Sequence, residues 1–378
     1  MESEILWKIT ELRHRLHMHP ELSLQEKWTK ETLLAFLKEN TGLYTEDRGR
    51  WCFAYYDCGD PSAETVGFRA DFDALPMEEK EGLSYGSEVP GVCHKCGHDG
   101  HSAVLAGLAM EVDRHGADKN VYFIFQHGEE IGAGGEECAG LIREKGISRV
   151  FAFHNMSGFP EGSIVVRDGV AHCTSKGLTV RMKGAPAHAS QPEDGKNPAA
   201  ALSELVLYKD EAENAGGYRG FILGTVVCVN IGSKNFGISA SDGELSMTLR
   251  ADYEADLRIL ESRIREKAED LGRTYGLAVS CEEQDFFPET VNDPEAVESV
   301  RKAAQSCGFP VLELSRTFRG SEDFGYYLKM CPGAIFYIGN GEEYPAIHTH
   351  EFDFNDRILE TAVDVFHAIV RQNFSARG

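Results

Sequence analysis

The sequence predicts an α/β protein with a doubly wound, mainly parallel sheet and a smaller ferredoxin-like α+β domain inserted into it. Its 378 residues are more than one hydrophobic core usually serves, so we expect two domains. Buried strands alternate with helices in both terminal parts, which is typical of a parallel sheet. The middle part has a separate order of elements. We therefore expect one domain from residues 1–174 and 287–378, and a second from residues 175–286.

The N-terminal part predicts two helices followed by alternating strands and helices. Residues 3–18 have a helical period that stops before Pro20, and "LSLQEKWTKETLLAFLKEN" fits a second helix. Three apolar runs typical of buried strands then alternate with two helical patterns, in the order 65–70, 101–116, 120–126, 135–146 and 149–155. This alternation favours a sheet that is covered by helices on both faces.

The middle part predicts four strands and two helices that form a unit complete in itself. In chain order they are the strand "KGLTVRMKG", the helix "NPAAALSELVLYKDEAENAGG", the strands "FILGTVVCVNIG" and "GELSMTLRADY", the helix "ADLRILESRIREKAEDLGRTYG" and the strand "LAVSCEEQDF". The order β-α-β-β-α-β is that of the ferredoxin-like unit. After about residue 290 helices and strands alternate again, with "GAIFYIGN" (333–340) as a buried strand, so the middle part is an insertion.

Composition excludes some classes of function. Acidic residues outnumber basic ones by 61 to 38, which gives a formal charge of −23 and argues against nucleic acid as a partner. Residues 1–19 lack the apolar core of a signal peptide, and no apolar run approaches the roughly eighteen residues of a membrane span. We therefore expect a cytoplasmic protein without a membrane partner. Its 10 cysteines are scattered, and we expect them to be reduced.

Metal-binding side chains follow several of the predicted strands. In open α/β sheets, ligands bind beyond the carboxyl ends of the strands. The side chains at these ends are Asp71, Asp73, Glu129, Glu130 and His154. The segment before the helix at 101–116 adds Cys96 and His98, and the segment after the strand at 333–340 adds His348 and His350. Thiolate, imidazole and carboxylate together suit zinc better than magnesium or calcium. The number of donors is enough for two metal ions.

The stretch "GVCHKCGHDGHSA" (91–103) allows other interpretations of its cysteines. A structural zinc knuckle built on Cys93 and Cys96 needs a second C-x-x-C pair, which the sequence lacks. A redox pair should open a helix in a thioredoxin-like unit, whereas a glycine and two histidines follow here. We interpret Cys93 as a packing residue. A cysteine hydrolase that uses Cys96 with His98 stays open.

Seven motifs occur in the same order as in the M20 metallopeptidase family: "FRADFDALPMEE", "GVCHKCGHDGHSA", "QHGEEIGAGG", "AFHNMSGFPEGSI", "APAHASQPEDGKNPAAA", "GSEDFGYYL" and "IHTHEFDFND". The sequence resembles the amidohydrolase branch of that family, with its hippurate, auxin-conjugate and N-acyl-amino-acid hydrolases, from about residue 10 to 360. His127 in "QHGEE" and Lys95 in "HKCGHD" depart from the common pattern. Neither residue replaces a ligand.

The resemblance implies a site and a mechanism. It makes Cys96 a metal-bridging ligand, Glu129 the general base, and His188 of a second subunit the group that stabilises the oxyanion. The other implied ligands are His98, Glu130, His154 and His348, with His350 as an alternative to His348. The implied substrate-binding residues are Asn235 and Arg250. We expect the carboxylates that orient the metal-bound histidines to be Asp71, Asp73 and Asp99.

The resemblance also implies cofactors, partners and a substrate class. We expect two divalent metal ions per subunit, with zinc favoured and manganese or cobalt as alternatives. The larger domain would be catalytic, and the inserted domain would serve as a lid and join two subunits into a homodimer. The expected reaction is hydrolysis of the amide bond of N-acyl amino acids. A dipeptidase or aminopeptidase, and a non-catalytic metal-dependent binding protein, are the alternatives.

Overall fold

The computed structural model describes residues 1–374 and divides the chain into two compact units. Unit 1 consists of Met1–Ala171, Thr290–Arg316 and the residues from Asp323 onward. Unit 2 consists of His172–Glu289 and the short segment Thr317–Glu322. The sequence placed the inserted domain at residues 175–286 and gave no signal for the additional segment.

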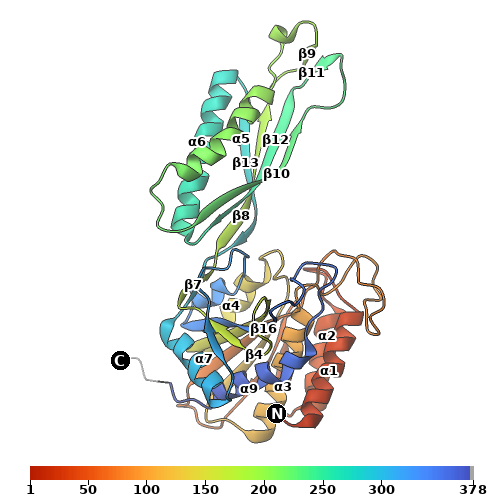
Figure 1. Ribbon diagram of the computed structural model, residues 1–378, viewed down its shortest axis with the longest axis vertical. Helices are drawn as coiled ribbons and strands as arrows, with labels where there is room; N and C mark the ends of the chain where they lie inside the picture. Colours follow the sequence, from red (N-terminus) through yellow and green to blue (C-terminus); the bar gives the residue numbers. More distant parts are fainter. Residues whose placement is uncertain (375–378) are drawn as a thin grey trace. The chain divides into compact units, whose positions relative to one another are not determined.

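Unit 1 is built from helices and strands that alternate along most of its length (Figure 1). Its helices are α1 (Ser3–Met18), α2 (Trp28–Asn40), α3 (His98–His115), α4 (Gly134–Lys145), α7 (Pro294–Ser306), α8 (Gly325–Leu328) and α9 (Leu359–Val370). The strands of its large sheet are β1 (Tyr44–Asp47), β2 (Cys52–Tyr56), β3 (Thr65–Asp71), β4 (Asn120–Gln126), β5 (Arg149–Ser157), β6 (Ile164–Val166), β15 (Val311–Glu313) and β16 (Gly333–Gly341). A small separate sheet pairs β7 (Gly169–His172) with β14 (Thr290–Asn292).

The large sheet has the strand order β1-β2-β4-β3-β5-β16-β6-β15. Its centre is parallel, because β3 pairs in parallel with both β4 and β5, and β5 pairs in parallel with β16. Strands β1 and β2 are antiparallel additions at one edge, and β6 pairs antiparallel with β16 but parallel with β15. The prediction of an α/β fold with a large, mainly parallel sheet is confirmed.

Helices cover both faces of this sheet, as strand β4 illustrates. Its alternate residues Val121, Phe123 and Phe125 join the core formed with α1, α2, α3, α7 and α9. Tyr122 and Ile124 point to the opposite core, which includes residues of α4 and α8. Because successive side chains of a strand point to opposite faces, a strand between two helical layers must be apolar throughout. This explains the continuous apolar runs in the sequence.

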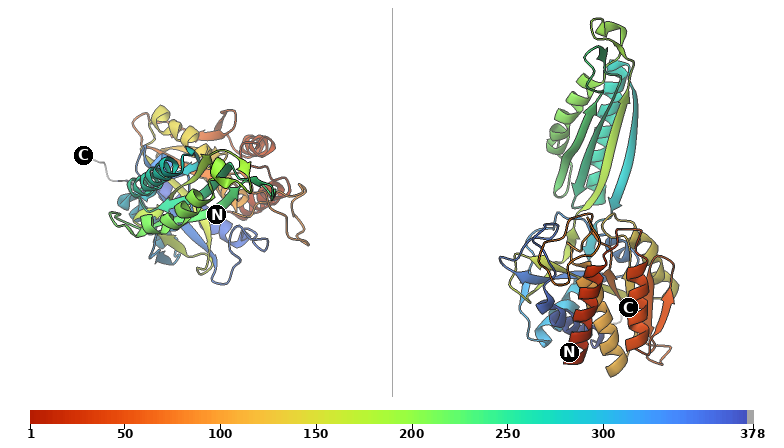
Figure 2. Two further views of the ribbon diagram at one scale, coloured as in Figure 1. Left: turned by 90° about the horizontal axis from the view of Figure 1, so that it is seen from above. Right: turned by 90° about the vertical axis from the view of Figure 1, so that its right-hand side faces the viewer.

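Unit 2 has its own four-stranded antiparallel sheet with the order β10-β12-β8-β13 (Figure 2). Its elements are β8 (Thr174–Lys183), β9 (Ala187–His188), α5 (Ala199–Asn214), β10 (Ile222–Ile231), β11 (Ile238–Ser239), β12 (Asp242–Ala251), α6 (Glu254–Tyr275) and β13 (Ala278–Phe287). Leu178, Val180 and Met182 of β8 are buried in a core shared with α5 and α6. The alternate residues Arg181 and Lys183 are exposed, so one face of the sheet carries polar side chains.

The parallel strands set the position of the candidate site. Strands β3 and β4 pair in register up to Asp71 and Gln126, so the loops that follow them leave from the same edge of the sheet. Residues 127–133 follow β4 and lead into α4, and the loop before α3 contains Cys96. Among residues 1–374, no helix has both the length and the apolar character needed to cross a membrane.

Candidate metal centre

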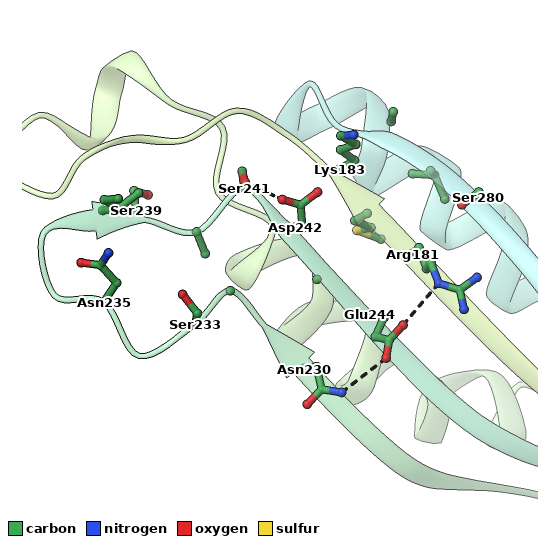
Figure 3. A pocket seen from close by; sticks show the side chains of 17 residues that line it. Arg181, Lys183, Asn230, Ser233, Asn235, Ser239, Ser241, Asp242, Glu244 and Ser280 are labelled. Carbon is green, nitrogen blue, oxygen red and sulfur yellow. Dashed lines mark hydrogen bonds and ion pairs between the residues drawn. The ribbon is translucent and has the colours of Figure 1, made fainter.

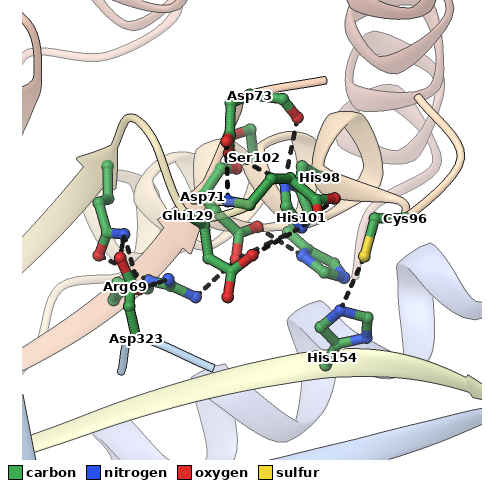
Figure 4. Close-up of polar contacts among 12 residues, drawn as sticks. Arg69, Asp71, Asp73, Cys96, His98, His101, Ser102, Glu129, His154 and Asp323 are labelled. Carbon is green, nitrogen blue, oxygen red and sulfur yellow. Dashed lines mark hydrogen bonds and ion pairs between the residues drawn. The ribbon is translucent and has the colours of Figure 1, made fainter. Parts of the chain in front are cut away.

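Five of the residues singled out by the sequence come together at this edge of the sheet. Figure 4 shows three of them, Cys96, His98 and His154. One ligand atom from each of Cys96, His98 and His154 lies within 4.8 Å of the other two. A second group with the same spacing consists of Cys96, Glu130 and His348. The Sγ atom of Cys96 is 3.4 Å from Nε2 of His154, and Nε2 of His348 is 3.5 Å from Oε2 of Glu130. Cys96 therefore belongs to two adjacent groups of donors.

Two atoms of this cluster lack the partners that buried polar groups normally have. Nε2 of His98 and Oε1 of Glu130 are buried and have no hydrogen-bond partner among the described residues. Leaving such an atom unsatisfied costs about 1–3 kcal/mol, so a bound cation would remove a penalty. The donor set of one thiol, three imidazoles and one carboxylate is also the chemistry of borderline-soft divalent metals. The residues present thus fit divalent metal ions.

The electrostatics of the cluster also favour a cation. Hydrogen bonds to Cys96 and Glu130 raise the pKa of His348 to about 10. Burial alone would lower the pKa of His98, but the charges of Asp71 and Cys96 outweigh it and raise that pKa well above its ordinary value. Burial, together with the charge of Glu130, raises the pKa of the Cys96 thiol. The pKa of His154 is instead held well below its ordinary value by burial and the charge of His101. The surroundings of His98 and His348 favour positive charge, and metal binding would displace the protons that these two imidazoles retain.

Asp73 orients donors from two loops at once. Its Oδ1 lies 3.1 Å from Nδ1 of His98, and its Oδ2 accepts the backbone N–H of Glu130 at 2.9 Å. The hydroxyl of Ser23 also donates to Oδ2, at 2.7 Å. Because Nδ1 of His98 faces the carboxylate and the carbonyl oxygen of Asp73, Nε2 is left to face the cluster. The structure therefore gives Asp73 the contact with His98 that the sequence analysis expected.

Asp71 and Asp99 have other main partners. Asp71 accepts hydrogen bonds from Nδ1 of His101 and Nη1 of Arg69, both at 2.6 Å, and lies 3.9 Å from Nε2 of His98. Burial would raise the pKa of Asp71, but the positive charges of His98 and Arg69 keep it well below its usual range. Asp99 pairs with Arg13 and His17 on α1 instead of with a histidine of the cluster. Its carboxylate thus connects α3 to the N-terminal helix.

Glu129 lies beside the cluster and belongs to neither of the two groups that share Cys96. Its Oε2 is 3.8 Å from Nε2 of His98, and its side chain is mostly buried. The preceding residue, Gly128, has a positive φ of 60° and donates its backbone N–H to Oε1 of Glu26 at 2.7 Å. Burial and the charge of Asp73 raise the pKa of Glu26 to about 8. Sequence reasoning missed Glu26, which precedes α2 in a segment without a recognisable spacing.

His350, the alternative to His348, is exposed, and its Nδ1 lies 3.1 Å from the carbonyl oxygen of Glu78. The other predicted site residues belong to unit 2, and the structure does not gather them into one place. His188 is exposed in β9, where its Nδ1 lies 2.7 Å from Oγ of Ser190. Asn235 lies in the loop between β10 and β11, beside a cavity of about 690 Å³ (Figure 3). Arg250 lies near the other end of β12, where it donates to the carbonyl of Arg319 at 2.9 Å and to Ser321 at 2.8 Å. Within one chain, the length of β12 separates Asn235 from Arg250.

The chain belongs to peptidase family M20/M25/M40, whose family model matches residues 67–372. Two relatives align with almost the whole chain. The N-acetylcysteine deacetylase of Bacillus subtilis (strain 168) is 28% identical in an alignment 377 residues long, which covers 95% of each protein. Thermostable carboxypeptidase 1 of Saccharolobus solfataricus is 30% identical over 396 residues, which cover 97% of this chain and 95% of the relative.

A solved structure gives the same result. The YXEP protein of Bacillus subtilis, described as a dinuclear metal-binding peptidase from the M20 family, aligns with a TM-score of 0.83 and 25% identity over 98% of both chains. The resemblance inferred from the motifs is thereby confirmed. The protein is a metal-dependent hydrolase of amide bonds.

Proposed function

We propose that the protein hydrolyses the amide bond of N-acyl amino acids with two divalent cations per subunit, one on each side of Cys96. The observation that carries this proposal is that two groups of donors share the Cys96 thiol, with the Glu129 carboxylate next to them. The substrate class is supported by the relative named N-acetylcysteine deacetylase. Zinc is favoured because thiol and imidazole donors dominate the set, and manganese and cobalt are the alternatives.

The proposed mechanism assigns the proton transfers to Glu129. When bound, the cations would polarise the scissile carbonyl and make a water molecule more acidic. Glu129 accepts the proton of the attacking water and passes it to the amide nitrogen, so that the C–N bond breaks and the amine leaves. Asp73 keeps Nε2 of His98 directed to the cluster throughout, because it binds the opposite ring nitrogen. The ligand roles of Glu130, His154 and His348 belong to the same proposal.

Residues of unit 2 complete the proposed site through a homodimer. The partner subunit's His188 would donate a hydrogen bond to the carbonyl oxygen as negative charge develops there. Asn235 and Arg250 are assigned to the carboxylate of the substrate. β10 supports such an assembly, since it is an outer strand of its sheet and exposes Val227 and Val229 at 66% and 43%.

The test compares substrates with blocked and free amino groups. Purified protein reconstituted with zinc, manganese or cobalt should hydrolyse N-acetyl and N-benzoyl amino acids faster than Gly-X dipeptides. The second candidate, a peptidase, is favoured by the carboxypeptidase relative and by the peptidase description of YXEP. Faster cleavage of the dipeptides would establish that candidate. Absence of turnover on both panels in metal-loaded protein would favour a binding protein.

A further inference from the structure

We propose that Lys95 is a positioning residue, whose side chain holds the loop that carries His348 against the loop that carries Cys96. The inference rests on the proposed function, because it concerns the donors assigned to one of the two cations. Lys95 is one of the two departures from the common family pattern, and the mechanism above gives it no role.

The side chain of Lys95 is buried and connects two parts of its own loop, between β3 and α3, to the loop that follows β16. Its Nζ atom donates to the carbonyl oxygen of Phe352 at 2.8 Å and to Oε1 of Glu79 at 2.5 Å. Lysine is almost never fully buried unless it is paired, because removing an ammonium group from water is costly. Glu79 lies in the same connection between β3 and α3 as Lys95, whereas Phe352 lies in the loop that follows β16. The buried ammonium group therefore holds the loop after β16 to the Cys96 loop, and Glu79 balances its charge.

One of these loops contains His348 in an unusual backbone conformation. His348 has a φ of 60°, in the left-handed region that residues other than glycine rarely adopt. Its backbone N–H donates to the carbonyl oxygen of Lys95 at 2.7 Å. The side chain of His348 is 48% exposed, so neighbouring side chains enclose only half of it. Backbone contacts therefore hold it, and Lys95 binds both ends of the segment from His348 to Phe352.

A buried chain of contacts anchors Glu79, the other partner of Lys95. The second oxygen of Glu79 lies 2.8 Å from Nε2 of His17, whose Nδ1 lies 2.7 Å from Oδ2 of Asp99. Asp99 directly follows His98 at the start of α3. The contacts thus lead from Lys95 through Glu79 and His17 back to the other side of Cys96. The side chain of Lys95 is therefore held by residues other than the proposed metal ligands.

This arrangement predicts an uneven effect on the two cations. Without the ammonium group, the segment from His348 to Phe352 keeps the backbone bond from His348 to Lys95 but loses its link at Phe352. The donor group of Cys96, Glu130 and His348 is then held less firmly. The group of Cys96, His98 and His154 keeps its geometry, because Asp73 and the start of α3 hold it. One cation should therefore bind much more weakly, and the other should bind as before.

The test is titration of the metal-stripped full-length protein with Co²⁺, followed by visible absorption and by metal analysis of the filtered complex. The variant is Lys95→Met, which keeps the length of the side chain and removes its charge. The matched control is Lys30→Met. Lys30 is also a buried lysine of unit 1, and its Nζ binds Asp47 at 2.7 Å and the carbonyl of Gly49 at 2.5 Å.

The wild type and Lys30→Met should each bind two Co²⁺ ions, and the affinity of each site should be the same in the two proteins. Lys95→Met should bind one ion with unchanged affinity and the second about 10–100-fold more weakly, as for other losses of groups that orient ligands. Two ions bound to Lys95→Met at wild-type affinity would overturn the inference and leave the proposed function intact. A wild type that binds fewer than two ions would overturn the proposed function, and the inference with it.

A second variant covers the case in which Lys95→Met does not fold. Glu79→Gln removes the negative charge that faces Lys95 but leaves the bond between Lys95 and Phe352. It should also lower the affinity for the second Co²⁺ ion, by a smaller factor than Lys95→Met. Equal weakening of both ions, or no weakening at all, would contradict the positioning role.

Discussion

Glu129 and Glu130 are neighbours in the sequence, but their carboxylates have different surroundings. Glu130 has one oxygen without a hydrogen-bond partner and the other 3.5 Å from His348, while its backbone N–H is fixed by Asp73. Glu129 points to the same region from a turn that Glu26 stabilises through Gly128. These surroundings support the proposal that Glu130 is a donor to a cation and that Glu129 transfers protons.

This division predicts the result of Glu129→Gln. The substitution keeps the size of the side chain but removes its ability to accept a proton at neutral pH. We expect kcat to fall by about 10²–10⁴-fold, the usual contribution of a general base, while two metal ions stay bound. Steady-state kinetics and metal analysis on the same sample measure both effects. Glu136→Gln, an exposed glutamate of α4, is the control and should behave as the wild type. Unchanged kcat in Glu129→Gln would remove this residue from the mechanism.

The pKa of His17 predicts how the free energy of unfolding depends on pH. Burial would lower its pKa, but the hydrogen bonds that His17 donates to Asp99 and Glu79 outweigh that effect and raise the pKa. Its stabilising effect is therefore complete below the unfolded pKa of about 6.5 and is lost as pH rises through the higher folded pKa. The lowered pKa of Asp99 has the opposite sign, so its contribution is lost as pH falls below about 4.

Urea unfolding of the wild type and His17→Gln over a range of pH measures this effect. We expect the difference in the free energy of unfolding to be largest at about pH 5–6, between the unfolded pKa values of the two groups, and to shrink toward both extremes. A difference that increases steadily with pH above 7 would show that His17 is buried in its neutral form.

Residue types at strand ends indicated where donor side chains would gather, and the family resemblance then selected five of them as the predicted ligands. Cys96, His98, Glu130, His154 and His348 have metal-binding chemistry, and they follow buried strands or precede a helix. Other residues of the site could not be predicted in this way. Glu26 contacts Gly128, which is more than 100 positions away in the sequence, and Lys95 contacts Phe352, which is more than 250 positions away. No local spacing in the sequence indicates such pairs.

At the scale of elements, the turn between β4 and α4 places Glu129 and Glu130. The chain folds back so closely that a Cβ atom on Gly134 would lie 1.6 Å from the carbonyl oxygen of His127. Gly128 adds the positive φ that begins this reversal. The backbone of this turn therefore requires the glycines on both sides of the Glu-Glu pair.

Gly134→Ala tests the need for this close approach. The added methyl group must push the turn apart, so we expect a lower melting temperature together with reduced activity. Gly140→Ala is the matched control, because Gly140 lies in the same helix and a Cβ atom there meets nothing within 4 Å. The control should raise stability by about 0.5–1 kcal/mol through helix propensity. Equal stability of the two variants, measured by thermal unfolding, would contradict the steric account.

At the scale of the whole molecule, the large sheet was predictable because its central strands are buried on both faces. The apolar runs of β3, β4 and β5 follow directly from that burial. Short edge strands such as β1 and β15 were not predicted, since a strand with one exposed side and few residues has no distinct pattern.

The exact extent of unit 2 could not be predicted from the sequence either. Residues 317–322 join this unit through the backbone bond from Cys173 to Phe318, at 3.1 Å, and through the contacts of Arg250 with Arg319 and Ser321. These bonds link positions far apart in the chain. Periodicity reports only on neighbours along the sequence, so it could not reveal them.

We propose that two cations bind, one on either side of the Cys96 thiol. The most direct test is anomalous diffraction at the zinc absorption edge from crystals of the zinc-loaded protein. We expect two peaks per subunit, each about 2.3 Å from Sγ of Cys96, one near His98 and His154 and the other near Glu130 and His348. A single peak, or peaks that do not contact Cys96, would contradict the proposal.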